Sequence, residues 1–122
     1  MFSFFKLYII AFALFVSLSF AQAAPSLLLI LVKTESTGRS NFLTLTCDPT
    51  GGSHPNPSAA CAQLAAVNGN ITQIPPTAGV ACTLQYDPVS VTVLGTYGGR
   101  GISFQQTYGN SCTMGIALGD FL

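Results

Sequence analysis

Four cysteines constrain the fold of this 122-residue chain more than any other feature of its sequence. In a small secreted domain, cysteines pair into disulfides that compensate for a limited hydrophobic core. Four cysteines allow three pairings, and their spacing does not choose among them. A zinc site is the alternative, although no two of the four are spaced as Cys-x-x-Cys. We therefore expect no metal and two disulfides among Cys47, Cys61, Cys82 and Cys112.

The first 23 residues have the features of a secretory signal peptide. Lys6 precedes an apolar run from residue 7 to residue 20, and Ala21-Gln22-Ala23 forms a small-x-small cleavage pattern. An uncleaved membrane anchor is the alternative, because an apolar run of about 18 residues or more can span a bilayer. Serines interrupt this run, however. We therefore expect a signal peptide at 1–23, one mature domain at 24–122, and a secreted, extracellular protein without membrane contact after cleavage.

Charged residues are few and scattered along the chain. Lys and Arg together number 4, as do Asp and Glu, so the formal net charge at pH 7 is +0. A protein that binds nucleic acid or an anionic membrane gathers its basic residues into a patch, and the sequence has no such cluster. We expect no nucleic-acid partner, no cofactor, and recognition through shape, apolar contacts and backbone hydrogen bonds.

The residue types for hydrolysis or phosphate binding are present without the required motifs. His54 is the single histidine, and with Asp48 and nearby serines it could imitate a hydrolase triad. No Gly-x-Ser-x-Gly nucleophile motif accompanies it. The glycine-rich residues 98–101 lack the Lys-Ser/Thr of a phosphate-binding loop. We expect His54 to order its loop, the glycines to form a turn, and the protein not to be an enzyme.

Hydrophobic periodicity and turn residues predict an α+β fold. Asn56 as N-cap and Pro57 at the first helical position predict a helix over 58–67, and a second, short helix is expected at 111–118. Apolar or alternating runs indicate strands, with a Gly98-Gly99 hairpin turn expected within 95–101. The predicted strands are 26–34, 42–47, 86–94, 102–108 and an edge strand at 120–122. The expected fold is a five-stranded antiparallel sheet with two helices packed on one face.

Asn70-Ile71-Thr72 matches the N-glycosylation pattern Asn-x-Thr. Pro75, Pro76 and Gly79 follow it, so this part of the chain is predicted to be an irregular connection. Asn70 is therefore a predicted glycosylation acceptor.

Two stretches and one short motif carry a resemblance to a known family. They are LTLTCDPTGGSHPNPSAACAQLAAV from Leu43 to Val67, ACTLQYDPV from Ala81 to Val89, and Asn110-x-Cys112. Together they resemble the subtilisin inhibitor-like family, small secreted proteins that block serine proteases. The resemblance implies a five-stranded sheet with two helices and homodimers formed through the sheet. It also implies the disulfides Cys47 to Cys61 and Cys82 to Cys112.

In that family, an exposed peptide two residues past a disulfide cysteine is offered to the protease as bait. The resemblance implies that the reactive bond is Leu84-Gln85, with Cys82, Thr83 and Tyr86 as flanking protease contacts. Thr83 departs from the family pattern, in which proline is frequent. Asn110 matches a position that supports the loop by hydrogen bonding.

A leucine at the pocket position implies subtilisin-like and chymotrypsin-like serine endopeptidases as partners. Burying its side chain contributes about 1.5 to 3 kcal/mol, so tight binding also needs a loop that is already ordered. We expect a secreted, substrate-mimicking inhibitor of such proteases. The alternative is a secreted, disulfide-rich interaction protein that uses the same scaffold without inhibiting proteases.

Overall fold

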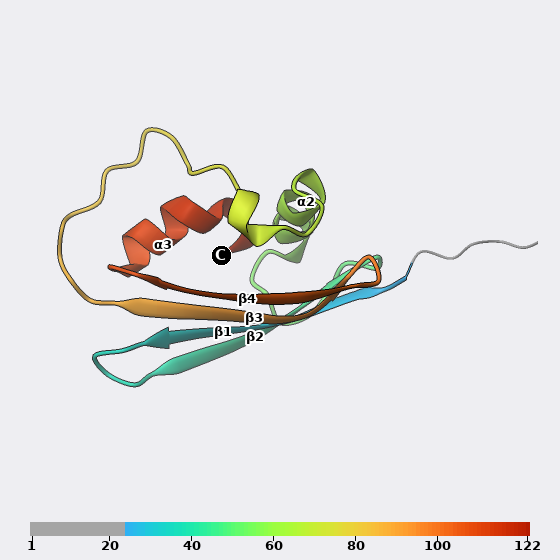
Figure 1. Ribbon diagram of the computed structural model, residues 1–122, viewed down its shortest axis with the longest axis horizontal. Coiled ribbons are helices and arrows are strands. Elements are labelled where there is room, and N and C mark those ends of the chain that lie inside the picture. Colours follow the sequence, from blue (N-terminus) through green and yellow to red (C-terminus); the bar gives the residue numbers. More distant parts are fainter. Residues whose placement is uncertain (1–23) are drawn as a thin grey trace, which may run out of the picture.

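The structure is a computed structural model that describes residues 24–122, so the predicted signal peptide at 1–23 lies outside the described residues. It is an α+β fold with one antiparallel sheet, and the helices lie together on one face of that sheet (Figure 1). Within 24–122, no helix has the length and apolar character needed to cross a membrane. The elements in chain order are β1 (Ser26–Thr34), β2 (Ser40–Cys47), α2 (Pro57–Ala66), η1 (Ile71–Gln73), β3 (Val89–Tyr97), β4 (Arg100–Tyr108), α3 (Ser111–Leu118) and η2 (Gly119–Phe121).

The sheet has the strand order β2-β1-β3-β4, and every neighbouring pair is antiparallel. Ile30 of β1 lies opposite Leu43 of β2 and Val93 of β3. Because side chains alternate along a strand, Ile30 is buried under the helices while its neighbour Leu29 is exposed on the outer face. Among residues 24–122, the helical layer covers one face of the sheet and leaves the other uncovered.

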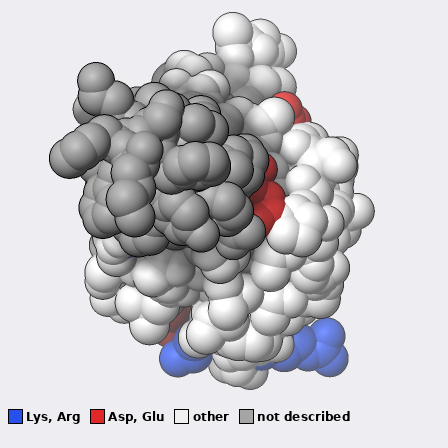
Figure 2. Space-filling model, turned by 90° about the vertical axis from the view of Figure 1, so that its right-hand side faces the viewer, with Lys and Arg blue, Asp and Glu red and all other residues white. Residues whose placement is uncertain are grey.

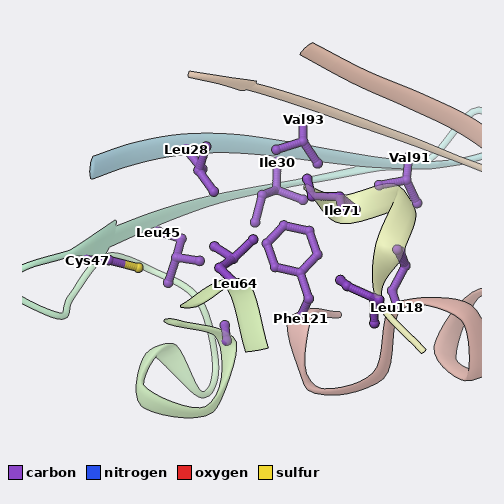
Figure 3. Packing of buried hydrophobic residues seen from close by; sticks show 12 residues of the cluster. Leu28, Ile30, Leu45, Cys47, Leu64, Ile71, Val91, Val93, Leu118 and Phe121 are labelled. Atoms are coloured by element: carbon purple, nitrogen blue, oxygen red, sulfur yellow. The ribbon is translucent and has the colours of Figure 1, made fainter. Parts of the chain in front are cut away.

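The hydrophobic core lies between the inner face of the sheet and the helical layer. Figure 3 shows the ring of Phe121 at the centre of this layer, pointing toward Ile30 of the sheet, with Leu64 of α2 and Leu118 of α3 beside it. All four of these side chains are almost completely buried. The buried cluster consists of Leu28, Ile30, Leu45, Cys47, Ala60, Leu64, Ile71, Ile74, Val91, Val93, Leu118 and Phe121.

The prediction of a fifth strand is wrong. Residues 119–121 form the 3-10 helix η2, and the described sheet has four strands. The physical reason is the burial of Phe121, whose exposed fraction is 0%. Its carbonyl oxygen accepts a hydrogen bond from Nε2 of His54 at 2.7 Å. These contacts hold the end of the chain in the helical layer instead of at a sheet edge.

The predicted strand at 86–94 is displaced in the structure, where β3 runs over Val89–Tyr97. Pro88 has no N–H to donate to a strand ladder, and the strand begins directly after it. At the other end, Gly95 lies inside the strand rather than in the turn. A Cβ at Gly95 would lie 2.0 Å from the carbonyl oxygen of Leu27, so only glycine allows β3 to pass this close to β1. The hairpin turn is therefore confined to Gly98 and Gly99.

The first helix agrees closely with the prediction. Oδ1 of Asn56 accepts a hydrogen bond from the backbone N–H of Ala59 at 3.4 Å, and Pro57 is the first residue of α2. The second helix has the predicted bounds, Ser111–Leu118. The connection predicted to be irregular contains one short ordered turn, η1 at Ile71–Gln73. This turn places Ile71 in the core.

Candidate functional site

A fully exposed leucine lies in the long connection between η1 and β3. The exposed fraction is 100% for Leu84 and 81% for Tyr86. Residues 74–88 contain no helix or strand and arch away from the sheet beside α3, the yellow to orange arc in Figure 1. Residues 82–87 of this arch form the exposed segment. A side chain this exposed buries almost no apolar surface on folding, so the surface of Leu84 is available to a partner.

A disulfide holds the start of the exposed segment. Cys82 is bonded to Cys112 in the first turn of α3, with a Cα–Cα distance of 5.8 Å. The other disulfide joins Cys47 at the end of β2 to Cys61 in α2. These are the pairings that the resemblance implies. All four sulfur atoms are used in disulfides, so none is free to bind zinc.

A single amide group, the side chain of Asn110, holds the exposed segment on both sides of Leu84. Nδ2 of Asn110 donates to the carbonyl oxygen of Thr83 at 3.1 Å and to that of Gln85 at 2.9 Å. Both N–H groups of the amide are therefore directed at the segment. This arrangement fixes the backbone around Leu84 while leaving the leucine side chain in solvent.

The helix α3 determines which way the Asn110 amide faces. Asn110 is the N-cap of this helix, and its Oδ1 accepts from the backbone N–H of Thr113 at 2.9 Å. The backbone N–H of Asn110 donates in return to Oγ1 of Thr113 at 3.2 Å, which completes a capping box. With Oδ1 committed to the helix, Nδ2 faces the exposed segment.

The end of the exposed segment is held by residues that the sequence analysis did not identify. The hydroxyl of Ser36, in the β1–β2 turn, donates to Oδ1 of Asp87 at 2.8 Å. The backbone N–H of Asp87 donates to the carbonyl of Gly109 at 2.9 Å, and that of Glu35 donates to the carbonyl of Pro88 at 3.0 Å. No local pattern could reveal the Ser36 to Asp87 contact, since 51 positions separate the two residues.

Glu35 is further restrained by its own side chain. Its carboxylate accepts a hydrogen bond from Oγ of Ser90 at 2.8 Å and lies 3.6 Å from Nζ of Lys33. The hydrogen bond from Ser90 and the charge of Lys33 lower the pKa of this carboxyl below its ordinary value. Both contacts hold the β1–β2 turn in its position beside Pro88.

The backbone of Leu84 itself is free. Within residues 24–122, neither its N–H nor its carbonyl oxygen takes part in an intramolecular hydrogen bond. An extended peptide with unpaired main-chain groups can add as a strand to the edge of a partner protein. The exposed segment can therefore bind through its backbone while the side chain of Leu84 enters a pocket.

The candidate site is thus a protrusion and not a cavity. A hollow of about 270 Å³ lies elsewhere, between η1, β4 and α3. Across the described part of the chain, no group of three or more His, Cys, Asp or Glu side chains is arranged to hold a metal ion. Most of the described surface in Figure 2 is uncharged, with a few charged groups on it. We therefore expect a partner to recognise this surface by its shape and by backbone hydrogen bonds.

His54 has a structural role that occupies both ring nitrogens. Nε2 donates to the carbonyl oxygen of Phe121 at 2.7 Å, and Nδ1 accepts from the backbone N–H of Asn56 at 2.9 Å. The side chain is buried and joins the loop before α2 to the C-terminus. It is not available as the base of a hydrolase triad.

Comparisons with known proteins point to one family. Residues 24–110 match the family model described as subtilisin inhibitor-like. The chain is 41% identical over 101 residues to subtilisin inhibitor-like protein 5 of Streptomyces fradiae, which covers 79% of this chain and 94% of that relative. It is 40% identical over 103 residues to a subtilisin inhibitor of Streptomyces violaceus, covering 80% and 70% of the two chains.

A solved structure shares the fold. The crystal structure of Streptomyces caespitosus sermetstatin in complex with Bacillus licheniformis subtilisin matches with a TM-score of 0.65 and 32% sequence identity, covering 78% of this chain and 93% of that chain. The family-model match, the sequence identities and the shared fold agree with one another. The chain belongs to the subtilisin inhibitor-like family.

Proposed function

We propose that this protein inhibits subtilisin-like and chymotrypsin-like serine endopeptidases by presenting Leu84-Gln85 as a substrate-mimicking reactive bond. Cys82, Thr83 and Tyr86 are the flanking contacts with the protease. The observation that carries the proposal is the Asn110 amide, which holds the carbonyls on both sides of a completely exposed leucine. Its family membership supports the same role, and a relative with this fold has been solved bound to a subtilisin. The protein is an inhibitor and not an enzyme.

Leu84 contributes the pocket contact, and the anchors around it contribute the rest. Burying a leucine side chain stabilises a complex by about 1.5 to 3 kcal/mol. A loop that is already ordered also avoids the loss of about 0.5 to 1.5 kcal/mol for each side chain that binding would immobilise. The disulfide at Cys82, the Asn110 amide and the Ser36 to Asp87 hydrogen bond provide this order.

We expect the same anchors to slow cleavage of the reactive bond. The protease serine attacks the carbonyl carbon of Leu84, the peptide C–N bond breaks, and the new amine of Gln85 takes a proton from the protease histidine. Asn110 still holds the carbonyl of Gln85, so this amine stays beside the acyl group. Religation then competes with hydrolysis, and the inhibitor remains bound.

Thr83 lies at a position where proline is frequent in the family, and proline would itself stiffen the loop. Proline restricts φ to about −65°, whereas threonine leaves that torsion free. The hydrogen bond from Asn110 to the Thr83 carbonyl restrains the backbone at this position whichever residue type occupies it. We propose that inhibition persists with Thr83 at this position because the restraint comes from outside the segment.

We also propose that the protein is secreted and that it self-associates. The signal peptide at 1–23 would direct the chain out of the cell, where disulfides form and persist.

On the outer face of the sheet, the exposed side chains of Leu27, Leu29, Phe42 and Leu94 form an apolar surface. Leu31 also points outward from the centre of β1, and the other outward residues of the strand centres are Thr, Ser and Gln, while the outward charge of Lys33 lies near the end of that strand. We propose that this face pairs two copies in an isologous homodimer.

Inhibition of purified subtilisin by the mature domain tests the main proposal. We expect dose-dependent inhibition, and we expect long incubation with trace subtilisin at mildly acidic pH to yield one nick, between Leu84 and Gln85. No inhibition at micromolar protein would favour the alternative, an interaction protein on the same scaffold. Inhibition with a nick at another bond would keep the function and move the site.

A further inference from the structure

The sequon at Asn70 belongs to no part of the inhibitory mechanism, and its surroundings suit a modified side chain. Asn70 and Thr72 are exposed, whereas Ile71 between them is buried in the core. The buried isoleucine anchors the tripeptide, and the acceptor asparagine points away from the core. Such a surface position is what an N-linked glycan requires.

The amide nitrogen of Asn70 is free to carry a substituent. Oδ1 of Asn70 accepts a hydrogen bond from Oγ1 of Thr72 at 2.6 Å. Nδ2 makes no hydrogen bond to any residue within 24–122. A bond from this nitrogen to a sugar therefore breaks no interaction of the folded protein.

The sequon is held firmly against the β3–β4 hairpin. A Cβ at Gly69, whose φ is +75°, would lie 2.6 Å from the ring of Tyr97, so glycine lets the loop pack directly on that ring. The guanidinium of Arg100 also donates to the carbonyl oxygen of Asn68. These two contacts fix the position of Asn70 relative to β4.

A shallow hollow lies between the sequon and β4. Its volume is about 150 Å³, and its β4 side is lined by Ile102, Ser103 and Phe104 among others. In the sheet formed by residues 24–122, β4 is also an edge strand, since its one neighbour there is β3. An uncovered edge offers unpaired backbone groups to other chains and is an aggregation hazard.

We propose that Asn70 carries an N-linked glycan and that its first sugar lies over this hollow, where it covers part of the β4 edge. The donor is a lipid-diphosphate-linked oligosaccharide. Nδ2 bonds to C1 of the first sugar, the C1–O bond to the diphosphate breaks, and the amide loses one proton while the lipid diphosphate leaves. The apolar side of the sugar ring meets Ile102 and Phe104.

The glycan is compatible with protease inhibition. The hollow is lined by residues from 69–72 and 101–104, and none comes from the exposed segment at 82–87. The inference rests on the proposed secretion of the chain and not on its inhibitory activity. Loss of one property would therefore leave the other intact.

Secretion of the full chain from a yeast that performs N-glycosylation tests the proposal. Peptide N-glycosidase in oxygen-18 water should convert Asn70 to labelled aspartate, and the removed mass should equal that of a glycan. N70Q and T72A should remove the modification and T72S should retain it, while N41Q, which alters an exposed asparagine outside any sequon, should leave it unchanged. Secreted wild-type protein with unmodified Asn70 would overturn the site.

Hydrogen exchange tests where the glycan lies. We expect the amides of residues 101–104 to exchange more slowly in the glycosylated protein than after enzymatic removal of the glycan. Equal exchange would overturn the placement over β4. Subtilisin inhibition, measured on both forms, should be the same, so failure of the inhibitory proposal would be seen separately.

Discussion

Leu84 and Asn110 have complementary roles at the scale of single residues. The side chain of Leu84 adds little to the stability of the folded protein, because it is fully exposed, and it is free to fill a pocket. The side chain of Asn110 forms hydrogen bonds with Thr83, Gln85 and Thr113 and makes no direct contact with the protease pocket. The motif around Cys82 predicted Leu84 and the Asn110-x-Cys112 motif predicted Asn110, but the orientation of the Asn110 amide could be seen only in the structure, since it depends on the helix cap at Thr113.

Replacing Leu84 separates the pocket contact from the scaffold. We expect L84G to weaken subtilisin binding by more than about 1.5 kcal/mol, which is more than about tenfold, because it removes the pocket contact and loosens the backbone. L84K should shift the preference toward trypsin-like enzymes. Inhibition constants against subtilisin and trypsin measure both effects. Unchanged affinity of L84G, or an L84K variant that still binds subtilisin and ignores trypsin, would contradict the assignment.

Replacing Asn110 separates the helix cap from the loop contact. Aspartate is as good an N-cap as asparagine, but it has no N–H groups for the carbonyls of Thr83 and Gln85. We expect N110D to keep thermal stability within a few degrees and to be cleaved faster at Leu84-Gln85. The inhibition constant should rise by about tenfold or more, since two hydrogen bonds of about 0.5 to 1.5 kcal/mol each are lost. N110D with wild-type inhibition and wild-type resistance to cleavage would show that the amide is not the support.

At the scale of elements, the exposed segment is held between the N-terminus of α3 and the β1–β2 turn. The bounds of α2 and α3 could be predicted from their caps and composition, which act locally. The predicted strand begins too early, because Tyr86 is a residue type that favours strands and the alternating valines from Val89 follow it closely. β3 begins at Val89 because the two residues before it form other hydrogen bonds. Asp87 donates to the carbonyl of Gly109, and the carbonyl of Pro88 accepts from Glu35.

The β1–β2 turn provides the test of this support. We expect S36A to lose the hydrogen bond to Asp87, to raise the inhibition constant a few-fold, and to speed cleavage of the bound inhibitor, on the basis of about 0.5 to 1.5 kcal/mol for one hydrogen bond. S36T keeps the hydroxyl and should restore slow cleavage. S58A makes the same change on the exposed face of α2 and should have no effect. Cleavage of S36A at the wild-type rate would remove Ser36 from the loop support.

At the scale of the whole molecule, the two faces of the sheet differ in how they are covered. Helices cover the inner face, and within the described chain the outer face is uncovered, with Leu29 of β1 directly opposite Leu94 of β3. The sequence indicated this arrangement only in part. The continuous apolar run at 27–32 is typical of a strand buried on both faces, and it is consistent with an outer face covered by a second copy.

A charge in the outer face tests self-association. We expect the mature domain to be a dimer in sedimentation or light-scattering measurements and L94E to be a monomer, because the partner copy would place a second glutamate close by. S58E adds the same charge on α2 and should remain dimeric. L94E should still inhibit subtilisin, since the exposed segment lies outside this face. A monomeric wild type, or a dimeric L94E, would contradict the proposed interface.

The sequence by itself determined the fold class, the two helices, four of the strands and the family, because periodicity, caps and short motifs act over a few residues. Only the tertiary structure decided that residues 120–122 do not form a strand. Burying Phe121 beneath Ile30 stabilises the protein more than pairing these residues with an edge strand of the sheet would. The tertiary structure also decided how the exposed segment is held. The contacts of Asn110 span 27 and 25 positions and that of Ser36 spans 51, and contacts over such separations exist only once the sheet and α3 have brought distant residues together.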